Sequence, residues 1–280
     1  MKYILSEKSG FCFGVKHAVD TVNKLLDDGN SLCCYGSLIH NKKAIEKLSE
    51  KGLCTENDLD NIDCEKYKNI VIRAHGAAPF VYEKLKQKGV YITDLTCPYV
   101  KKIQNIVHEN SKKGRQTIIF GDENHPEIIG IKGYAGENVI VLKDLQELKN
   151  SSPQIKDEAL AVFQTTFNLN LFEETAAYLK ENFSSVRIID TVCRETQNRQ
   201  NAVMETAKKV DFMIIIGDKT SSNSKKLYEI SKKICPSVFI EEVFELKKIP
   251  LNEYETVGVA AGASTPGFII DSALAYLKSI

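Results

Sequence analysis

Apolar residues recur along the chain in two alternating patterns, which together predict a repeated strand–helix order. Short apolar runs at Leu32–Tyr35, Thr117–Phe120 and Phe212–Ile216 are typical of buried strands. After Cys12 and after Cys97 the apolar residues instead recur three and four positions apart, which predicts helices that bury one face. Strands and helices that alternate in this way favour parallel sheets with helical crossovers. The pattern therefore predicts an α/β protein.

The expected elements fall into three similar units, each opened by a helix that follows Cys12, Cys97 or Cys193. Further helices are expected at 41–51, 80–88, 126–133, 171–182, 224–234 and 267–278. Strands are expected at Lys2–Leu5, Leu32–Tyr35, 69–73, 90–95, Thr117–Phe120, Leu160–Phe163, 186–190, Phe212–Ile216 and 257–261. The third unit lacks a closing strand of its own, so we expect Lys2–Leu5 to supply it.

This order predicts a division into a segment 1–13 that completes the third unit, followed by units at 14–96, 97–192 and 193–280. Three small α/β units related by a pseudo-threefold axis would direct the same edge of each sheet at a central cavity. Ligands of parallel sheets bind beyond the carboxyl ends of the strands. The cavity is therefore the expected location of a functional site.

The composition is that of an ordinary globular protein, with 43% hydrophobic and 26% charged residues among 280. Lys and Arg together number 37, and so do Asp and Glu together. The chain therefore has no net charge that would recruit nucleic acid or an anionic membrane. No apolar run approaches the roughly 18–20 residues that span a bilayer. The first residues also lack a signal-peptide pattern, so we expect a cytoplasmic protein whose thiols stay reduced.

Three of the eight cysteines occupy equivalent positions in the three units. Residues of metal- or anion-binding type lie 28 positions after each of them, and these are His40, His125 and Ser221 after Cys12, Cys97 and Cys193. Each cysteine also precedes a helix, where the helix dipole favours a thiolate. Three thiolates that meet at one centre would leave an open position for an exchangeable ligand, either on an iron–sulfur cluster or on zinc. The spacing alone does not separate these two alternatives.

Polar donors follow the predicted strands at the same edge. They are His40, His75, His125, Thr165, Thr166, Ser221, Ser222, Asn223, Ser264 and Thr265. Helix N-termini add backbone N–H groups that favour anions. Since few Lys or Arg residues lie in these turns, the ring of donors suits a phosphate or diphosphate held by neutral groups and histidines.

Glu127 is the carboxylate embedded in a predicted ligand turn, in the run His125-Pro126-Glu127. A glutamate in the first turn of a helix can simply complement the helix dipole. In a closed cavity it would instead be a good proton donor. Thr165, on the opposite turn, could orient or relay that proton.

With these motifs in place, the chain resembles the LytB-type family of 4-hydroxy-3-methylbut-2-enyl diphosphate reductases. The motifs that carry the resemblance are Gly10-Phe11-Cys12, Ile39-His40-Asn41, Arg73-Ala74-His75-Gly76, Asp94-Leu95-Thr96-Cys97-Pro98, Gly121 with His125-Pro126-Glu127, Gln164-Thr165-Thr166, Asp190-Thr191-Val192-Cys193, Arg199-Gln200, Ser221-Ser222-Asn223-Ser224 and Ala261-Gly262-Ala263-Ser264. They cover nearly the whole chain in order.

The resemblance implies a trefoil of three α/β domains around a [4Fe-4S] cluster that is held by Cys12, Cys97 and Cys193. One iron, not ligated by protein, would bind the substrate oxygen. The implied ligands of the substrate diphosphate are His40, His75, His125, Thr165, Ser221, Ser222, Asn223 and Ser264. Glu127, Thr165 and His125 are the implied catalytic residues.

The implied reaction is the last step of the non-mevalonate isoprenoid pathway. It would reductively dehydroxylate (E)-4-hydroxy-3-methylbut-2-enyl diphosphate to isopentenyl and dimethylallyl diphosphate. A ferredoxin- or flavodoxin-type protein would supply the electrons. Neither nucleic acid nor membrane is an expected partner.

The chain departs from the usual family pattern at several positions. Lys8-Ser9 stand where the family usually has Pro-Arg, and Phe13 replaces a small residue. Glu195 follows the third cysteine motif where alanine is usual, and Asp218 occupies a turn position that is often serine. None of these residues is a proposed ligand.

Two alternatives remain open on the residues alone. One is a hydratase or dehydratase in which the cluster acts only as a Lewis acid on a phosphorylated substrate. The other is a binding module without enzymatic activity, in which a Cys₃ zinc joins the three repeats. The second alternative gives the ring of polar donors no role.

Overall fold

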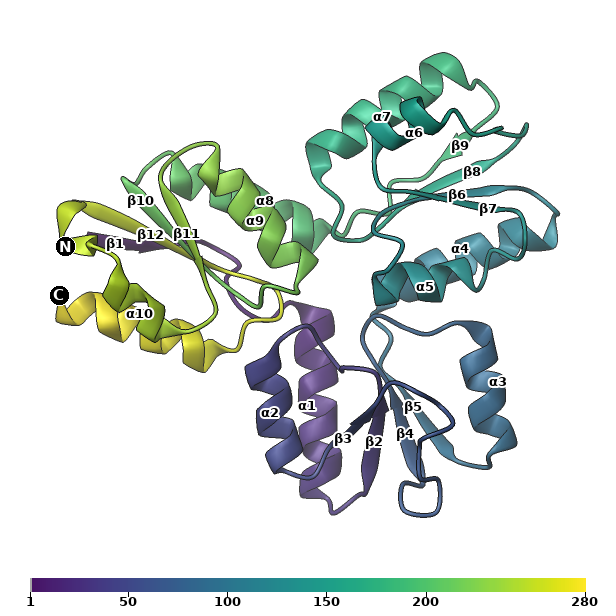
Figure 1. Ribbon diagram of the computed structural model, residues 1–280, viewed down its shortest axis with the longest axis horizontal. Coiled ribbons are helices and arrows are strands. Elements are labelled where there is room, and N and C mark those ends of the chain that lie inside the picture. The colour runs from purple at the N-terminus through teal and green to yellow at the C-terminus, as the bar shows by residue number, and fades with distance from the viewer. Residues whose placement is uncertain (1) are drawn as a thin grey trace. The chain divides into compact units, whose positions relative to one another are not determined.

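The computed structural model describes residues 2–280, and its strands form three four-stranded parallel sheets (Figure 1). The chain divides into two compact units. The first unit comprises Met1–Asp20, Ile39–Lys51 and Arg194–Ile280, and the second comprises Thr21–Leu38 and Gly52–Cys193. Met1, which belongs to the predicted segment 1–13, lies outside the described residues. Every strand pairing is parallel, which confirms the expected α/β class.

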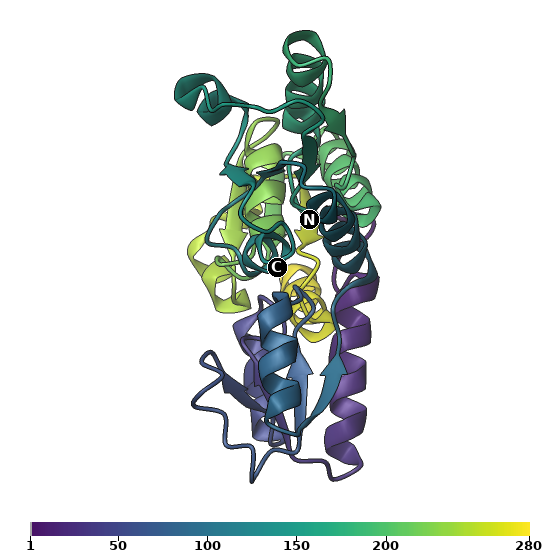
Figure 2. The ribbon, with the colours of Figure 1, turned by 90° about the vertical axis from the view of Figure 1, so that its right-hand side faces the viewer.

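The sheet of the first unit combines strands from both ends of the chain. Its order is β1-β12-β10-β11. The strands are β1 (Lys2–Leu5), β10 (Phe212–Ile216), β11 (Ser237–Ile240) and β12 (Thr256–Ala261). Lys2 pairs with Thr256 and Leu5 with Val259, so the expected closing role of the first strand is confirmed. Figures 1 and 2 show the first strand and the last helix of the chain within this unit.

Helices cover both faces of this sheet. The helices of the first unit are α2 (Lys42–Glu50), α8 (Arg194–Ala207), α9 (Ser222–Lys232) and α10 (Gly267–Ser279), with the short 3₁₀ helices η1 (Val243–Lys248) and η2 (Leu251–Glu253). Successive side chains of β10 point to opposite faces. Ile215 packs with Val203 of α8 and Leu227 of α9, whereas Ile214 packs with Ala273 of α10.

The second unit contains the other two sheets, with orders β3-β2-β4-β5 and β7-β6-β8-β9. The strands are β2 (Leu32–Tyr35), β3 (Cys54–Glu56), β4 (Asn69–Ile72), β5 (Tyr91–Asp94), β6 (Thr117–Phe120), β7 (Val139–Leu142), β8 (Leu160–Phe163) and β9 (Arg187–Ile188). The helices are α3 (Pro79–Gln87), α4 (Pro98–Lys112), α5 (Pro126–Lys132), α6 (Leu145–Ser151) and α7 (Leu169–Asn182). Helix α1 (Phe13–Asp27) begins in the first unit and ends in the second.

The apolar positions of these helices face the sheets as their spacing predicts. Val81 and Leu85 of α3 pack on the sheet that contains β2 and β4. Ile103 of α4 and Ile128 of α5 cover one face of the β6–β8 sheet, and Leu179 of α7 covers the other. Each sheet thus has a core built with helices that precede or connect its strands.

All three sheets share one strand order. The first strand of each repeat, β2, β6 or β10, lies between the second (β3, β7 or β11) and the third (β4, β8 or β12), and the fourth (β5, β9 or β1) lies at the far edge. The second strand of each sheet, namely β3, β7 and β11, is missing from the sequence-based expectation. Helix α6 is missing from it as well. Each missing strand pairs with a single neighbour at a sheet edge. A strand with one neighbour packs against fewer side chains, so its sequence needs a less regular pattern of apolar residues.

Candidate functional site

The residues predicted to form the site are divided between the two units. The first unit carries Cys12, His40, Ser221, Ser222, Asn223 and Ser264. The second carries His75, Cys97, His125, Glu127, Thr165 and Cys193. Every one of them follows the carboxyl end of a strand, as the repeat predicts.

The three repeated cysteines have the same local structure. Each directly precedes a helix, α1, α4 or α8, and each is partly buried without a disulfide. The backbone N–H groups of Cys12, Cys97 and Cys193 donate to the carbonyls of Ala263, Ala74 and Thr165 at 3.0, 2.9 and 2.9 Å. Those acceptors lie in the turns after the third strand of each sheet. The chain therefore presents three thiols at helix N-termini, where a thiolate is favoured.

Short side-chain turns direct the chain into two of these cysteines. Asp94 and Asp190 each lie three residues before a cysteine. Their carboxylates accept the N–H groups of Thr96 and Val192 at 3.1 and 3.0 Å. Aspartate favours such turns because its short side chain bonds the backbone two residues onward.

Cysteines outside the repeat occupy a different environment. Cys33 and Cys34 lie fully buried within strand β2. Burial raises the pKa of Cys34 to about 12, although nearby Arg73 acts against the increase. The pKa of Cys33 is also raised, first by burial and then by the adjacent Cys54. These thiols stay protonated and serve as small apolar side chains, as predicted.

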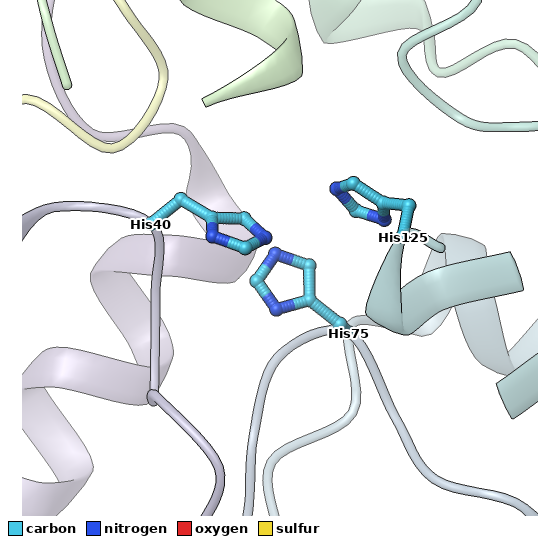
Figure 3. A group of neighbouring side chains, drawn as sticks. All are labelled: His40, His75 and His125. Carbon is cyan, nitrogen blue, oxygen red and sulfur yellow. The ribbon is translucent and has the colours of Figure 1, made fainter. Parts of the chain in front are cut away.

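His75 and His125 lie together in the second unit. Their rings meet edge to face with centroids 5.4 Å apart. Figure 3 shows the two labelled side chains. His125 is also the N-cap of α5, and its Nδ1 accepts the N–H of Glu127 at 3.2 Å. In the neutral ring this bond leaves the proton on Nε2. His125 can therefore donate from Nε2 to an anion.

The turn that carries His75 depends on a glycine. Gly76 has a φ of +73°, and its N–H donates to the carbonyl of Arg73 at 2.9 Å. A Cβ at this position would collide with Nε2 of Gln104. Only glycine satisfies both the left-handed backbone and this close approach.

Glu127 and Thr165 form a buried pair, as the sequence predicted. The N–H of Thr165 donates to Oε1 of Glu127, and the Thr165 hydroxyl donates to Oε2, both at 2.7 Å. Glu127 is 2% exposed. Burial raises the pKa of its carboxyl above the usual range, although the two hydrogen bonds from Thr165 lower it in part. A raised pKa favours the protonated form, which is the form that can donate a proton.

The first unit gathers serine and asparagine donors at the start of α9. Ser221 is the N-cap of this helix, and its hydroxyl accepts the N–H of Ser224 at 3.3 Å. Asn223 is 4% exposed, and neither atom of its amide has a hydrogen-bond partner among the described residues. A buried amide without a partner is uncommon and is explained by a ligand or a water. Asn223 is therefore well placed to bind a substrate group.

His40 is held between two other turns of the first unit. The hydroxyl of Ser264 donates to the carbonyl of His40 at 2.7 Å. Two residues onward, the N–H of Lys42 donates to Oδ2 of Asp218 at 2.9 Å. Asn41, between them, caps α2 by accepting the N–H of Ala44 at 3.0 Å. The donor proton of Ser264 is thus engaged with backbone, which the sequence did not indicate.

Two buried polar residues, Gln104 in the second unit and Asp218 in the first, were not predicted as site residues. Gln104 is fully buried, and no partner of its amide lies within residues 2–280. It follows Val100 and Ile103 on the apolar face of α4, so a glutamine at a core position was a readable signal. Asp218 was noted only as a departure from the family pattern.

The LytB protein family matches residues 3–278 of the chain. The chain belongs to the LytB family. A LytB relative from Clostridioides difficile (strain 630) is 38% identical over 284 residues, covering 100% of both chains. One from Helicobacter pylori (strain 26695) is 41% identical over 281 residues, again covering 100% of both. Both are named 4-hydroxy-3-methylbut-2-enyl diphosphate reductase.

Solved LytB structures match the fold as well. The reductase from Plasmodium falciparum has a TM-score of 0.92 at 26% identity, covering 99% of this chain and 88% of that one. A second structure, titled as the reductase that ends the non-mevalonate pathway, has a TM-score of 0.71 at 33% identity and covers 100% of both chains. No helix among residues 2–280 is both long and apolar enough to span a membrane.

Proposed function

We propose that this LytB-family chain reduces (E)-4-hydroxy-3-methylbut-2-enyl diphosphate to isopentenyl and dimethylallyl diphosphate. Each turnover consumes two electrons and two protons, breaks the C–O bond to the hydroxyl group and releases water. One observation carries the proposal. All three sheets place a cysteine after the fourth strand and a ligand-type residue after the first, within a chain whose relatives are reductases along their full length.

Cys12, Cys97 and Cys193 fit an iron–sulfur cluster. They are partly buried, form no disulfide and precede helices whose N-termini favour thiolates. We propose that they hold a [4Fe-4S] cluster, so that three protein ligands leave one iron without a protein ligand. When bound, the cluster supplies the electrons and a Lewis-acidic iron. The three sheets then correspond to the proposed units 14–96, 97–192 and 193–280, with 1–13 completing the last.

The diphosphate is held by polar donors rather than by lysines. His75 and His125 supply imidazole donors in the second unit, and Nε2 of His125 carries the proton because Nδ1 is engaged. The first unit supplies His40, Ser221, Ser222 and Asn223, and Ser264 contributes by holding the carbonyl of His40. The amide of Asn223 suits this role best, since it is buried without a partner among the described residues. Helix N-termini add favourable dipoles for the phosphate oxygens.

Glu127 delivers a proton during cleavage. Its burial favours the protonated carboxyl, and the bonds from Thr165 fix the orientation of both carboxyl oxygens. Thr165 also holds the turn that carries Cys193, since the carbonyl of Thr165 accepts the N–H of Cys193 at 2.9 Å. The proton donor is therefore fixed relative to one of the three cysteines. His125 sits two residues before Glu127 and completes the catalytic group.

The proposal includes a ferredoxin- or flavodoxin-type electron donor, which the resemblance to the LytB family implies, and a cytoplasmic location. The hydratase or dehydratase alternative is not favoured, since the LytB relatives are named as reductases. A structural Cys₃ zinc module is less favoured still, because it leaves the buried Glu127–Thr165 pair without a role.

Anaerobic purification tests the proposal. We expect iron and acid-labile sulfide without stoichiometric zinc, and turnover of the hydroxymethylbutenyl diphosphate only when a low-potential reductant is present. Cys97→Ser should lose the cluster, whereas Cys235→Ser, which changes a partly buried cysteine outside the repeat, should keep it. Zinc without sulfide, or equal turnover without reductant, would contradict the proposal.

A further inference from the structure

Asp218, one of the two carboxylates at positions where this chain departs from the expected LytB pattern, connects two separate turns. It lies in the turn between β10 and α9, three residues before Ser221, and is 8% exposed. Its Oδ2 accepts the N–H of Lys42, the first residue of α2, at 2.9 Å. Its Oδ1 accepts the N–H of Thr220 at 2.7 Å. One carboxylate thus joins chain segments 176 residues apart.

The bond to Lys42 acts directly on the position of His40. Lys42 is two residues past His40, and Ser264 donates to the His40 carbonyl from the other side at 2.7 Å. The segment from His40 to Lys42 is therefore held at both ends by turns of the same unit. Loss of the Asp218 bond would leave the first N–H of α2 without its acceptor.

The carboxylate of Asp218 is fully engaged within the protein. Both of its oxygens are engaged by N–H and hydroxyl donors of the protein, and a carboxylate exposed to a diphosphate would repel it. The attraction to His40 is one of the interactions that lower the pKa of Asp218 against the effect of burial.

The equivalent turn of the β6–β8 sheet provides a comparison. Asp122 follows Gly121 there, just as Asp218 follows Gly217. Asp122 accepts the N–H of Asn124 at 3.0 Å, which is the same local turn, but it is exposed. Asp218 alone adds the bond to a second helix. The local turn and the bridging bond can therefore be separated by experiment.

Resting on the proposed function, we propose that Asp218 is a positioning residue that fixes His40 against the Ser221 turn, so that the two together bind the diphosphate of the substrate. It sets affinity for the diphosphate and leaves the chemical step unchanged.

Four variants of the holoenzyme test this role. Asp218→Asn removes the carboxylate. Lys42→Pro removes only the N–H that Asp218 accepts, at a first helical position where proline is well tolerated. Lys42→Ala retains that N–H, and Asp122→Asn alters the equivalent turn. The readouts are kcat and KM for the hydroxymethylbutenyl diphosphate, and the dissociation constant of inorganic diphosphate measured by calorimetry.

We expect Asp218→Asn and Lys42→Pro each to raise KM and the diphosphate dissociation constant about tenfold, with kcat changed by less than about twofold. Because both variants disrupt the same contact between residue 218 and the N–H of residue 42, the affinity loss in the double variant should be no greater than the larger of the two single losses. Lys42→Ala and Asp122→Asn should match the wild type. The variants could change the dissociation constant of inorganic diphosphate as described while the wild type fails to reduce the hydroxymethylbutenyl diphosphate. In that case the proposed reaction is wrong and the role of Asp218 stands.

Three results overturn the inference. One is wild-type KM and diphosphate binding in Asp218→Asn. Another is a double variant whose KM and diphosphate dissociation constant rise by the product of the two single-variant factors. The third is a fall in kcat at unchanged KM, which would place Asp218 in the chemical step.

Discussion

Glu127 and Asp218 are both buried carboxylates bound by a threonine through its N–H and its hydroxyl, yet their pKa values move in opposite directions. Thr165 binds Glu127, and burial keeps the pKa of this carboxyl raised. Thr220 binds Asp218 in the same manner. Here burial also acts to raise the pKa, but the Thr220 bonds, the N–H of Lys42 and nearby His40 together lower it.

The difference shows that the threonine contact does not decide the protonation state. Glu127 is the more deeply buried of the two and receives only the two bonds from Thr165. Asp218 receives an additional backbone donor and lies near an imidazole. A proton donor and a structural anion thus arise from one local motif, and the surroundings determine which of them forms.

The largest effect is expected for Glu127→Gln. The amide of the variant preserves the shape of the side chain and can still accept from Thr165, but it has no acidic proton to deliver. We expect kcat to fall about 10²–10⁴-fold, the range typical of general acid catalysis. Iron and sulfide content and the KM should stay near the wild-type values. Loss of the cluster in this variant would show that Glu127 has a structural role instead.

Thr165→Val removes the hydroxyl bond and retains the backbone bond. Since that hydroxyl bond lowers the pKa of Glu127, its loss should raise the pKa further. We expect kcat to fall about tenfold from lost orientation, because one of the two hydrogen bonds that hold the Glu127 carboxyl is removed. Activity that needs protonated Glu127 declines as pH rises through its pKa, so the alkaline limb of kcat should move to higher pH. Movement to lower pH would contradict this account.

The two carboxylates should also affect stability with opposite pH dependence. The pKa of Asp218 is lowered, so its stabilisation is present above the ordinary value of 3.8 and is lost as pH falls through the folded-state pKa. Asp218→Asn should therefore cost about 2 kcal/mol at neutral pH and less in acid. Thermal unfolding from pH 3 to about pH 7 measures this difference.

The pKa of Glu127 is raised instead, so its protonated form stabilises the fold below 4.5, and this contribution is lost as pH rises through the folded-state pKa. Glu127→Gln should therefore gain stability relative to the wild type at neutral pH. Parallel pH profiles for the two variants would show that the environments do not differ as described.

The smallest effect is expected for Thr220→Val. This change removes the hydroxyl bond to Asp218 but keeps the N–H bond of residue 220 and that of Lys42. The expected cost is about 1 kcal/mol in unfolding free energy by chemical denaturation. KM should stay within about twofold of the wild type, since His40 remains held. A loss as large as that of Asp218→Asn would assign the effect to the local turn rather than to the bridge.

Much of this architecture could be read from the sequence because the chain repeats it. The apolar runs at Leu32–Tyr35 and Phe212–Ile216 indicated the central strands, and Lys2–Leu5 was correctly assigned to the last sheet. The second strand of each sheet, β3, β7 or β11, was missed. Cys54–Glu56 is short and half exposed, but Val139–Leu142 carried an apolar run that could have been used.

The site divides in the same way. Thr165 was expected opposite Glu127 because the repeat places both after neighbouring strands, and the structure shows the bond. The contact between Asp218 and Lys42 was not foreseeable. It depends on the register of two turns 176 residues apart, which local spacing does not encode.

The central claim is that Glu127 is protonated under conditions where Asp218 is ionised. Infrared difference spectra of wild type minus Glu127→Gln, recorded as the pH is raised, measure this directly through the C=O stretch of the protonated carboxyl. We predict that the band of Glu127 persists above pH 4.5, the ordinary value for glutamate. As the pH is raised, the C=O band of protonated Asp218, taken from wild type minus Asp218→Asn, should disappear before the pH reaches 3.8. Loss of the Glu127 band at or below pH 4.5 would contradict the account.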